Sequence, residues 1–272
     1  MKQPPLIASA ARVLDLSLGE MLWSRRSVFL ALLVGGPIVL SVAIRLLSAS
    51  FGPLQVNGEG IGGGALFGMM IWLLYIRFIV PVLGVFYGTA LIADEVDDRT
   101  ITYLFTRPIP RSAVLLGKYL AYLVCTVLLI LPSVVIVYLM VASIGGSLGQ
   151  SFPALVEDLA MLAIGLAAYG AVFSYVGARM KRPLVTGLVF AFGWEPAVLL
   201  FPGYLKRLTV GYYLQALVPH AMPDDSAISV LMQVFHEVPS VPVSIAALAV
   251  IIGGALWAAG RAVETREYVL EQ

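Results

Sequence analysis

The chain has 272 residues, of which 60% are hydrophobic and 12% are charged, and its formal net charge is +1. Soluble domains carry about 25% charged residues, so this composition, with a mean hydropathy of +0.94, predicts an integral membrane protein. The near-neutral charge argues against a nucleic-acid partner, and the single cysteine, Cys125, excludes an intrachain disulfide or a cysteine-based metal site.

Residues 1–27 precede the first long apolar run and have a different pattern. Apolar residues from Leu6 to Trp23 recur at helical spacing, with charged residues between them. Trp23, followed by Arg25 and Arg26, is typical of an anchor at the membrane interface. The segment is predicted to be an amphipathic helix on the cytoplasmic interface, with a frayed tail as the alternative.

Six apolar runs are long enough to cross a bilayer, which takes about 20 residues. They are Val28–Leu47, Ala65–Ile92, Val114–Val141, Leu155–Val176, Leu184–Phe201 and Val241–Gly260. Backbone polar groups cannot stay unsatisfied in lipid, so each run is predicted to be a helix of an all-α, six-span domain at 28–260. A tail at 261–272 follows. The first run begins late and exceeds the roughly 7–15 apolar residues of a signal peptide, which favours a retained span over a cleaved leader.

The placement of Lys and Arg predicts the orientation of these spans. With a cytoplasmic N-terminus, thirteen of the seventeen basic residues fall in cytoplasmic segments, three fall outside and one, Arg77, falls within a span. Cytoplasmic loops are enriched in Lys and Arg. Both termini are therefore predicted to be cytoplasmic, in a multi-pass protein of the plasma (inner) membrane.

Two charged residues fall inside the predicted spans, Arg77 in the second and Glu195 in the fifth. A central charge costs about 2.5–3.5 kcal/mol on insertion scales, so such residues usually face the interior of a bundle and pair. Three interpretations stay open. The two residues pair with one another, they line a transport path, or they snorkel to an interface with the help of Trp194.

A polar loop at 93–113 separates the second and third spans. Its charged and apolar residues are Asp94, Glu95, Asp97, Asp98, Arg99, Leu104, Phe105, Arg107 and Arg111. Pro108 and Pro110 end any helix within it, because the residue before a proline disfavours the α conformation. The pattern predicts a short amphipathic helix that is either a docking surface for a cytoplasmic partner or a solvated connector. The acidic residues are the feature that separates these two interpretations, because only Lys and Arg are needed to set the orientation of the spans in the membrane.

The segment at 202–239 is long for an outer loop. Apolar residues over Tyr204–Val218 recur at helical spacing, with Lys206 and Arg207 expected on the polar side. An amphipathic helix in or dipping into the outer leaflet is predicted there. The two histidines of the chain follow, sixteen residues apart, a spacing unlike that of zinc ligands, so no metal site is predicted.

The loop between the second and third spans also carries a family resemblance. Residues 93–104 read ADEVDDRTITYL, residues 106–111 read TRPIPR and residues 116–119 read LGKY. The segment has, in order, an acidic pair, a threonine, a short helix, a turn with two prolines and a Gly-Lys pair. This order resembles the signature of ABC-2 type transporter permeases over about 30 residues. The family often has Gly where Arg99 stands. The six-span plan extends the resemblance more loosely over the whole chain.

The resemblance implies the transmembrane subunit of an ATP-binding-cassette exporter. The loop would form a coupling helix whose charged and apolar residues, named above, contact an ATPase subunit, with the N-terminal helix beside it. The outer segment at Tyr204–Val218 would be a re-entrant helix. The implied partners are two copies of the ATPase, which carry ATP and Mg, and a second identical or related permease subunit, all within membrane lipid.

The sequence itself has no ATP site of the P-loop type. The segment Ser112–Tyr119 has Ser112 where the first glycine of a P-loop belongs and Tyr119 where Ser or Thr belongs. The chain is therefore predicted to carry no cofactor and to be no enzyme by itself. Three other functions remain as alternatives: a mechanical subunit of an assembly or maturation system, an ion-coupled carrier with two related halves, and an intramembrane enzyme, whose motifs are absent.

Overall fold

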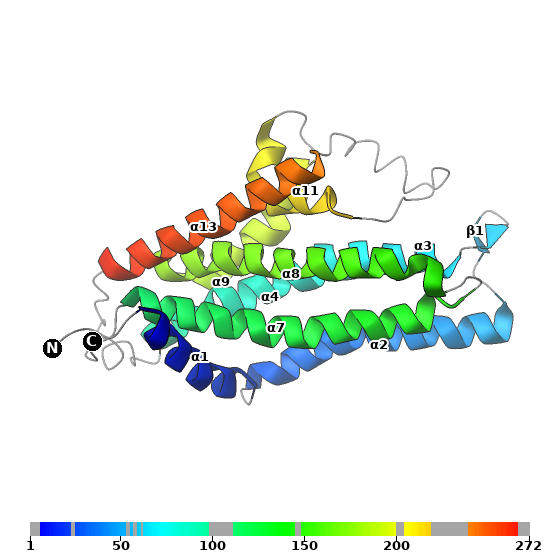
Figure 1. Ribbon diagram of the computed structural model, residues 1–272, viewed down its shortest axis with the longest axis horizontal. Coiled ribbons are helices and arrows are strands. Elements are labelled where there is room, and N and C mark those ends of the chain that lie inside the picture. Colours follow the sequence, from blue (N-terminus) through cyan, green and yellow to red (C-terminus); the bar gives the residue numbers. More distant parts are fainter. Residues whose placement is uncertain are drawn as a thin grey trace.

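The computed structural model describes residues 6–22, 25–52, 55–56, 59–60, 62–97, 111–144, 148–199, 204–218 and 239–265. Apart from one short hairpin, these residues form a bundle of helices whose long members run side by side (Figure 1). Five helical stretches are long and apolar enough to cross a membrane. The fold is that of a multi-pass, helical membrane protein.

The first half of the chain begins with α1 (Leu6–Leu22) and α2 (Arg25–Phe51). The strands β1 (Gln55–Val56) and β2 (Glu59–Gly60) then pair as a small antiparallel hairpin that the sequence did not predict. A long helical stretch follows in five parts, α3 (Gly63–Met70), η1 (Ile71–Ile79), α4 (Val80–Leu83), η2 (Gly84–Gly88) and α5 (Ala90–Asp97).

The second half begins with the two longest helices, α7 (Arg111–Val141) and α8 (Leu148–Arg179). A shorter helical stretch consists of α9 (Pro183–Leu188), η3 (Val189–Trp194) and α10 (Glu195–Leu199). The last elements are η4 (Tyr204–Leu208), α11 (Val210–Gln215) and α13 (Val241–Thr265).

Five of the six predicted spans match these long stretches. The matching ranges are Val28–Phe51, Gly63–Glu95, Arg111–Val141, Phe152–Arg179 and Val241–Thr265. The predicted run Leu184–Phe201 corresponds to a shorter apolar helix, Pro183–Val198, which falls below the length of the other five.

The two helical stretches that carry Arg77 and Glu195 share a local irregularity. The π-helical segments η1 and η3 each end two residues before a proline, Pro81 and Pro196. A proline lacks an N–H group and its ring clashes with the carbonyl four residues earlier, so a regular α-helical ladder cannot continue through it. The wider π turn is one way in which a helix accommodates such a break, and π turns are frequent at functional sites.

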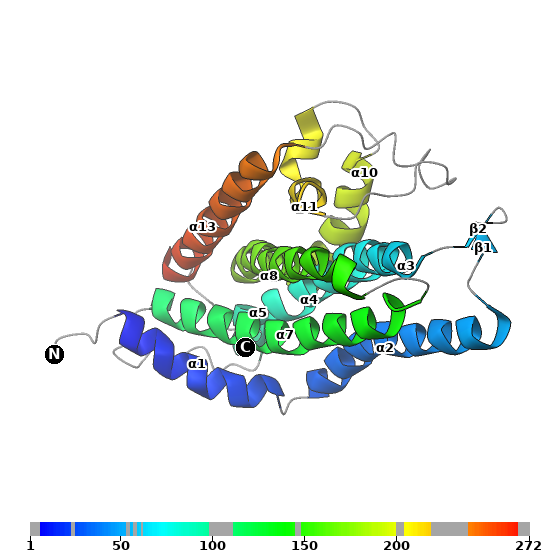
Figure 2. The same cartoon turned by 45° about the vertical axis from the view of Figure 1, so that its right-hand side comes forward.

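The core of the bundle lies between the α3–α5 stretch, α7 and α8. Its largest fully buried side chains are Phe67, Tyr75, Tyr122, Tyr169 and Phe173. Helix α2 packs against α7, while α11 and α13 lie on the other side of α8 (Figure 2). The outward faces of α2 and α13 expose large apolar side chains, as expected of helices that contact lipid.

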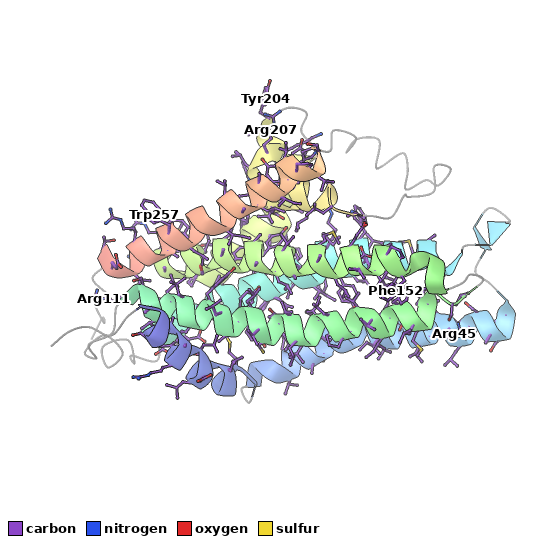
Figure 3. The ribbon with its side chains drawn as sticks, viewed as in Figure 1. Arg45, Arg111, Phe152, Tyr204, Arg207 and Trp257 are labelled. Carbon is purple, nitrogen blue, oxygen red and sulfur yellow. The ribbon has the colours of Figure 1, made fainter. Side chains whose placement is uncertain are left out.

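One end of the bundle collects the ends of four elements. Ile92 of α5, Leu115 of α7, Ala178 of α8 and Val263 of α13 belong to one buried cluster. Helices α8 and α13 therefore finish at the end where α7 starts. Arg111 marks this end and Arg45 of α2 marks the opposite one (Figure 3). We call it the Arg111 end.

Helix α1 is present where an N-terminal amphipathic helix was predicted, and it packs against α7. Gly117 of α7 makes this close approach possible. A Cβ atom at Gly117 would lie 2.6 Å from the carbonyl oxygen of Ala10 and 2.7 Å from Cβ of Val13. The placement of α1 on the membrane interface stays a prediction.

The segment predicted as one amphipathic helix at Tyr204–Val218 instead forms two short helices, η4 and α11. Thr209 separates them, and its hydroxyl donates to the carbonyl oxygen of Lys206 at 2.8 Å. Lys206 was expected on the polar side but is only 8% exposed. The expectation for Lys206 fails because η4, which carries it, packs against α10 and α11.

Candidate functional site

A buried carboxylate joins three helical elements in the interior of the bundle. Glu195 of α10 is 5% exposed and Tyr169 of α8 is 1% exposed. The Tyr169 hydroxyl donates a hydrogen bond to Oε2 of Glu195, and the backbone N–H of Val210 donates to Oε1 at 3.0 Å. Both carboxylate oxygens thus have a donor, which is the condition for keeping such a group buried. We call Arg77, Tyr169, Glu195 and the Val210 N–H the Glu195 cluster.

The Val210 N–H is the first of the donors that a helix leaves unsatisfied at its N-terminus. Thr209, the residue that precedes α11, makes no side-chain cap and donates instead to Lys206. Glu195 therefore provides the cap from another helix. A carboxylate is also favoured at this position by the helix dipole.

Arg77 completes the cluster from η1. Its guanidinium carbon lies 5.0 Å from the ring centroid of Trp72, close enough for a cation–π interaction. The same guanidinium is near enough to Glu195 for opposite charges on the two side chains to attract each other. The two intramembrane charges singled out in the sequence therefore act on each other within one subunit, while a direct Arg77–Glu195 ion pair stays a prediction.

Two glycines border this cluster, and the one at Gly84 makes a close approach of two helices possible. A Cβ atom at Gly84 of η2 would lie 2.7 Å from Cβ of Tyr169. A Cβ atom at Gly211 of α11 would lie 3.5 Å from Oε2 of Glu195 and 3.7 Å from the Tyr169 hydroxyl. Any larger residue at Gly84 would push the second helical stretch away from α8, and a long one at Gly211 would meet the carboxylate.

The cluster lies deep within the bundle. Tyr169 is ten residues before the end of α8 at Arg179, which is about 15 Å at 1.5 Å per residue. The hydrocarbon core of a bilayer is about 30 Å thick. The N-terminus of α11 therefore meets α8 about 15 Å from the C-terminal end of that helix.

Two buried residues of α8 were missed by the sequence reasoning. Tyr169 carries no signal of its own, because it stands among small apolar residues within a span. Asp158 is fully buried, and its signal was the acidic pair with Glu157 near the start of the predicted fourth span. That pair is as unusual within an apolar run as Arg77 or Glu195.

A second site lies at the Arg111 end, where α5 ends and α7 begins on either side of residues 98–110. Glu95 of α5 forms an ion pair with Lys118 of α7, and their side chains are 20% and 12% exposed. Asp94 is half-buried, Asp97 ends α5, and Arg111 begins α7 with an exposed side chain. Asp98, Arg99, Leu104, Phe105 and Arg107 lie outside the described residues.

The Glu95–Lys118 ion pair ties together the two helices that flank the loop. Both side chains are mostly buried, so the pair is less screened by water and salt than a surface salt bridge. Gly117, which contacts α1, is the neighbour of Lys118 in sequence. Two consecutive residues of α7 thus join it to two other helices: Gly117 contacts α1, and Lys118 pairs with Glu95 of α5. The role of Glu95 in contacting an ATPase stays a prediction.

Among the described residues, no group of three His, Cys, Asp or Glu side chains is arranged to hold a metal ion. The two histidines at 220 and 236 lie outside them.

Comparison with known families gives one match. A family model described as "ABC-2 family transporter protein" matches residues 18–194, well over half of the chain. The match runs from the end of α1 to the end of η3 and includes the loop at 93–113 and Arg77. It stops one residue before Glu195. A search of curated proteins gives no match.

The Glu195 cluster predicts a specific loss of stability. Glu195→Ala removes the acceptor of two buried donors, and Tyr169→Phe removes one of those donors. Hydrogen bonds within membrane bundles contribute about 1–2 kcal/mol at most, so each variant should lose about that much free energy of unfolding in mixed micelles. A double-mutant cycle should show coupling between the two changes.

Tyr213→Phe is the matched control for this experiment. The Tyr213 hydroxyl donates to the carbonyl oxygen of Arg207 at 3.0 Å, but this bond is exposed. Its loss should change the free energy of unfolding by less than about 0.5 kcal/mol. Equal effects of Tyr169→Phe and Tyr213→Phe would contradict the account of the cluster.

The ion pair at the Arg111 end predicts rescue by exchange of charge. Glu95→Lys and Lys118→Glu each place two like charges together and should lower the free energy of unfolding, whereas the double exchange should recover most of the loss. Coupling of about 1 kcal/mol is expected in a double-mutant cycle. Glu264→Lys, an exposed site on α13 at the same end, is the control and should show no coupling to Lys118. If the effects of the Glu95 and Lys118 substitutions on the free energy of unfolding were additive in the double-mutant cycle, the ion pair would be ruled out.

Proposed function

The chain belongs to the ABC-2 family of transporter proteins, and on that premise we propose that it is the permease subunit of an ATP-binding-cassette exporter. A separate ATPase subunit supplies the energy of ATP hydrolysis. The observation that carries the proposal is the family match, which covers the first four apolar spans and the loop between the second and third.

The loop at 93–113 is the proposed contact with the ATPase. The two helices that flank it, α5 and α7, are held together at the Arg111 end by the Glu95–Lys118 ion pair. A force on the loop would act on α5 and α7 jointly. The sequence has no P-loop, so ATP and Mg belong to the partner. Two ATPase copies and a second permease subunit, identical or related, complete the proposed transporter.

The proposed topology has six spans and cytoplasmic termini. Helices α8 and α13 finish at the same end of the bundle. The chain must therefore return to the opposite end between Arg179 and Val241, and the apolar helix Pro183–Val198 supports a crossing there. Six crossings place the loop at 93–113 and both termini on one side, which the distribution of Lys and Arg assigns to the cytoplasm of a plasma (inner) membrane.

Arg77 and Glu195 are proposed to hold the second and fifth spans together, rather than to snorkel. The 5% exposure of Glu195 and its two donors support this interpretation, since a snorkelling side chain would reach toward water. Movement of the second span would then displace the fifth span and α11.

The docking proposal is tested by the affinity of the permease for its ATPase. The permease is co-expressed with an ATP-binding-cassette ATPase encoded beside it, and the complex is purified and titrated. Asp97→Ala with Asp98→Ala should weaken the complex by about 1–2 kcal/mol, which is roughly five- to thirtyfold in Kd. Glu157→Ala, an exposed acid near the start of α8, is the control and should leave Kd unchanged.

Failure of the parent chain to bind any such ATPase, or unchanged affinity of the double variant, would refute docking at this loop. Reconstituted transport then separates export from a mechanical role, since hydrolysis without movement of any substrate would favour the latter.

A further inference from the structure

Both charged side chains of the Glu195 cluster are placed by helical turns that are wider than α turns. The backbone N–H of Glu195 bonds to the carbonyl oxygen of Phe190, five residues earlier, whereas an α-helix uses the carbonyl four residues earlier. The same kind of bond joins the Val80 N–H to the carbonyl oxygen of Tyr75 at the end of η1, which carries Arg77. Both segments therefore have a π register.

The contact between Arg77 and Trp72 supports the register of η1 independently of its backbone. The two residues are five positions apart, and the guanidinium carbon lies 5.0 Å from the ring centroid. In an α-helix, residues that face one another are three or four positions apart, and residues five apart are separated by about 140° around the axis. A turn with about one more residue brings them toward the same side of the helix.

The π register of η3 determines the direction in which Glu195 points. An α-helix turns by about 100° per residue and a π-helix by roughly 80°, because its turns hold about one more residue. Over the six residues of η3, the difference is roughly 120°. If η3 became α-helical while α9 kept its place against α8, the Glu195 carboxylate would turn away from the Tyr169 hydroxyl and the Val210 N–H.

Helix α11 depends on that carboxylate for its position. The N–H of Val210 has Glu195 as its acceptor, and Thr209, the residue before α11, makes no side-chain cap. Further along α11, Leu214 lies against α8, since a Cβ atom at Gly165 would be 3.2 Å from its Cδ1. With six residues, α11 is too short to be stable without such contacts.

We propose that η3 is a latch for α11. Its π register holds the Glu195 carboxylate on the N-terminus of α11, and conversion of η3 to an α-helix releases α11 from α8. Pro196 maintains the latched state, because it has no N–H for an α-helical ladder and its ring would clash with the carbonyl oxygen of Phe192, four residues earlier. The proposal rests on the packing of one subunit and not on transport.

Thiol labelling at the start of α11 tests the proposal. Val210 is 3% exposed, so Val210→Cys in a Cys125→Ser background reports the release of α11 as faster reaction of the purified full-length permease with N-ethylmaleimide. Pro196→Ala permits the α register and should raise the rate about tenfold, an effect within the range of one lost hydrogen bond in a membrane bundle. Glu195→Ala should raise the rate as much, and the two changes together should add nothing further.

Deletion of Gly193 provides a rescue that only a change of register explains. Five residues of an α-helix turn through about 500°, nearly the same angle as the roughly 480° of six residues in a π-helix. The deletion therefore returns Glu195 to its original direction, and Pro196→Ala combined with it should label as slowly as the parent. Deletion of Val189, at the start of η3, gives the same test if the first protein fails to fold.

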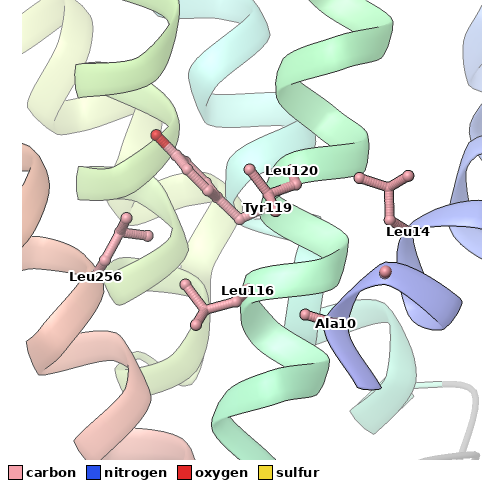
Figure 4. Close-up of a pocket in the computed structure, with 7 residues that line it drawn as sticks. Ala10, Leu14, Leu116, Tyr119, Leu120 and Leu256 are labelled. Atoms are coloured by element: carbon pink, nitrogen blue, oxygen red, sulfur yellow. The ribbon is translucent and has the colours of Figure 1, made fainter. Parts of the chain in front are cut away.

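Two variants outside the latch serve as controls. Pro132→Ala removes a proline from α7, which is α-helical throughout. Leu116→Ala removes apolar contacts from a groove of about 340 Å³ between α1, α7 and α13, and no residue that lines this groove belongs to η3, α10 or α11 (Figure 4). Both variants should label at the rate of the parent.

An unchanged rate in Pro196→Ala, an equal increase in Pro132→Ala, or fast labelling of the deletion variant would overturn the proposal. A faster rate in the Glu195→Ala and Pro196→Ala double variant than in Glu195→Ala would also overturn it, because Pro196 would then act on α11 without the carboxylate. No ATPase and no substrate take part in the measurement, so its failure leaves the proposed function untouched.

Discussion

A carboxylate buried among apolar helices is the constraint on which the interior of this bundle depends. An uncompensated charge in hydrocarbon costs several kcal/mol, so Glu195 stays buried only while its donors stay in place. Those donors belong to α8 and α11, and the nearby cation belongs to η1. One side chain therefore fixes the relative positions of the second, fourth and fifth helical stretches and of the short helix that follows them.

A chain of contacts connects this interior cluster to the Arg111 end. Lys118 pairs with Glu95, and the next residue, Tyr119, donates its hydroxyl to the carbonyl oxygen of Ala167. One turn further along α7, Tyr122 donates to the carbonyl oxygen of Leu166 at 3.0 Å. These acceptors lie two and three residues before Tyr169. The packed helices α7 and α8 thus link the ends of the loop at 93–113 to the residues that hold Glu195.

The sequence predicts the features that depend on hydropathy and on the free-energy cost of placing a charge in lipid. It does not predict the contacts that depend on tertiary packing. The long spans follow from apolar length, and the importance of Arg77 and Glu195 follows from the expense of a charge in lipid. Nothing in the local pattern shows that Tyr169 would reach Glu195 or that Lys118 would pair with Glu95, since those partners are 26 and 23 residues away. The burial of Lys206 reverses an amphipathic pattern because η4 packs against α10 and α11.

We propose that the chain crosses the membrane between α8 and α13, which places the loop at 93–113 on the same side as the end of α13. This crossing can be tested with single cysteines in a Cys125→Ser background, labelled in intact cells with a membrane-impermeant maleimide. Ser240→Cys, just before α13, should react in intact cells, whereas Lys181→Cys and Thr265→Cys should react only after permeabilisation. Reaction of Ser240→Cys and Lys181→Cys under the same condition would contradict the crossing and, with it, the proposed six-span permease.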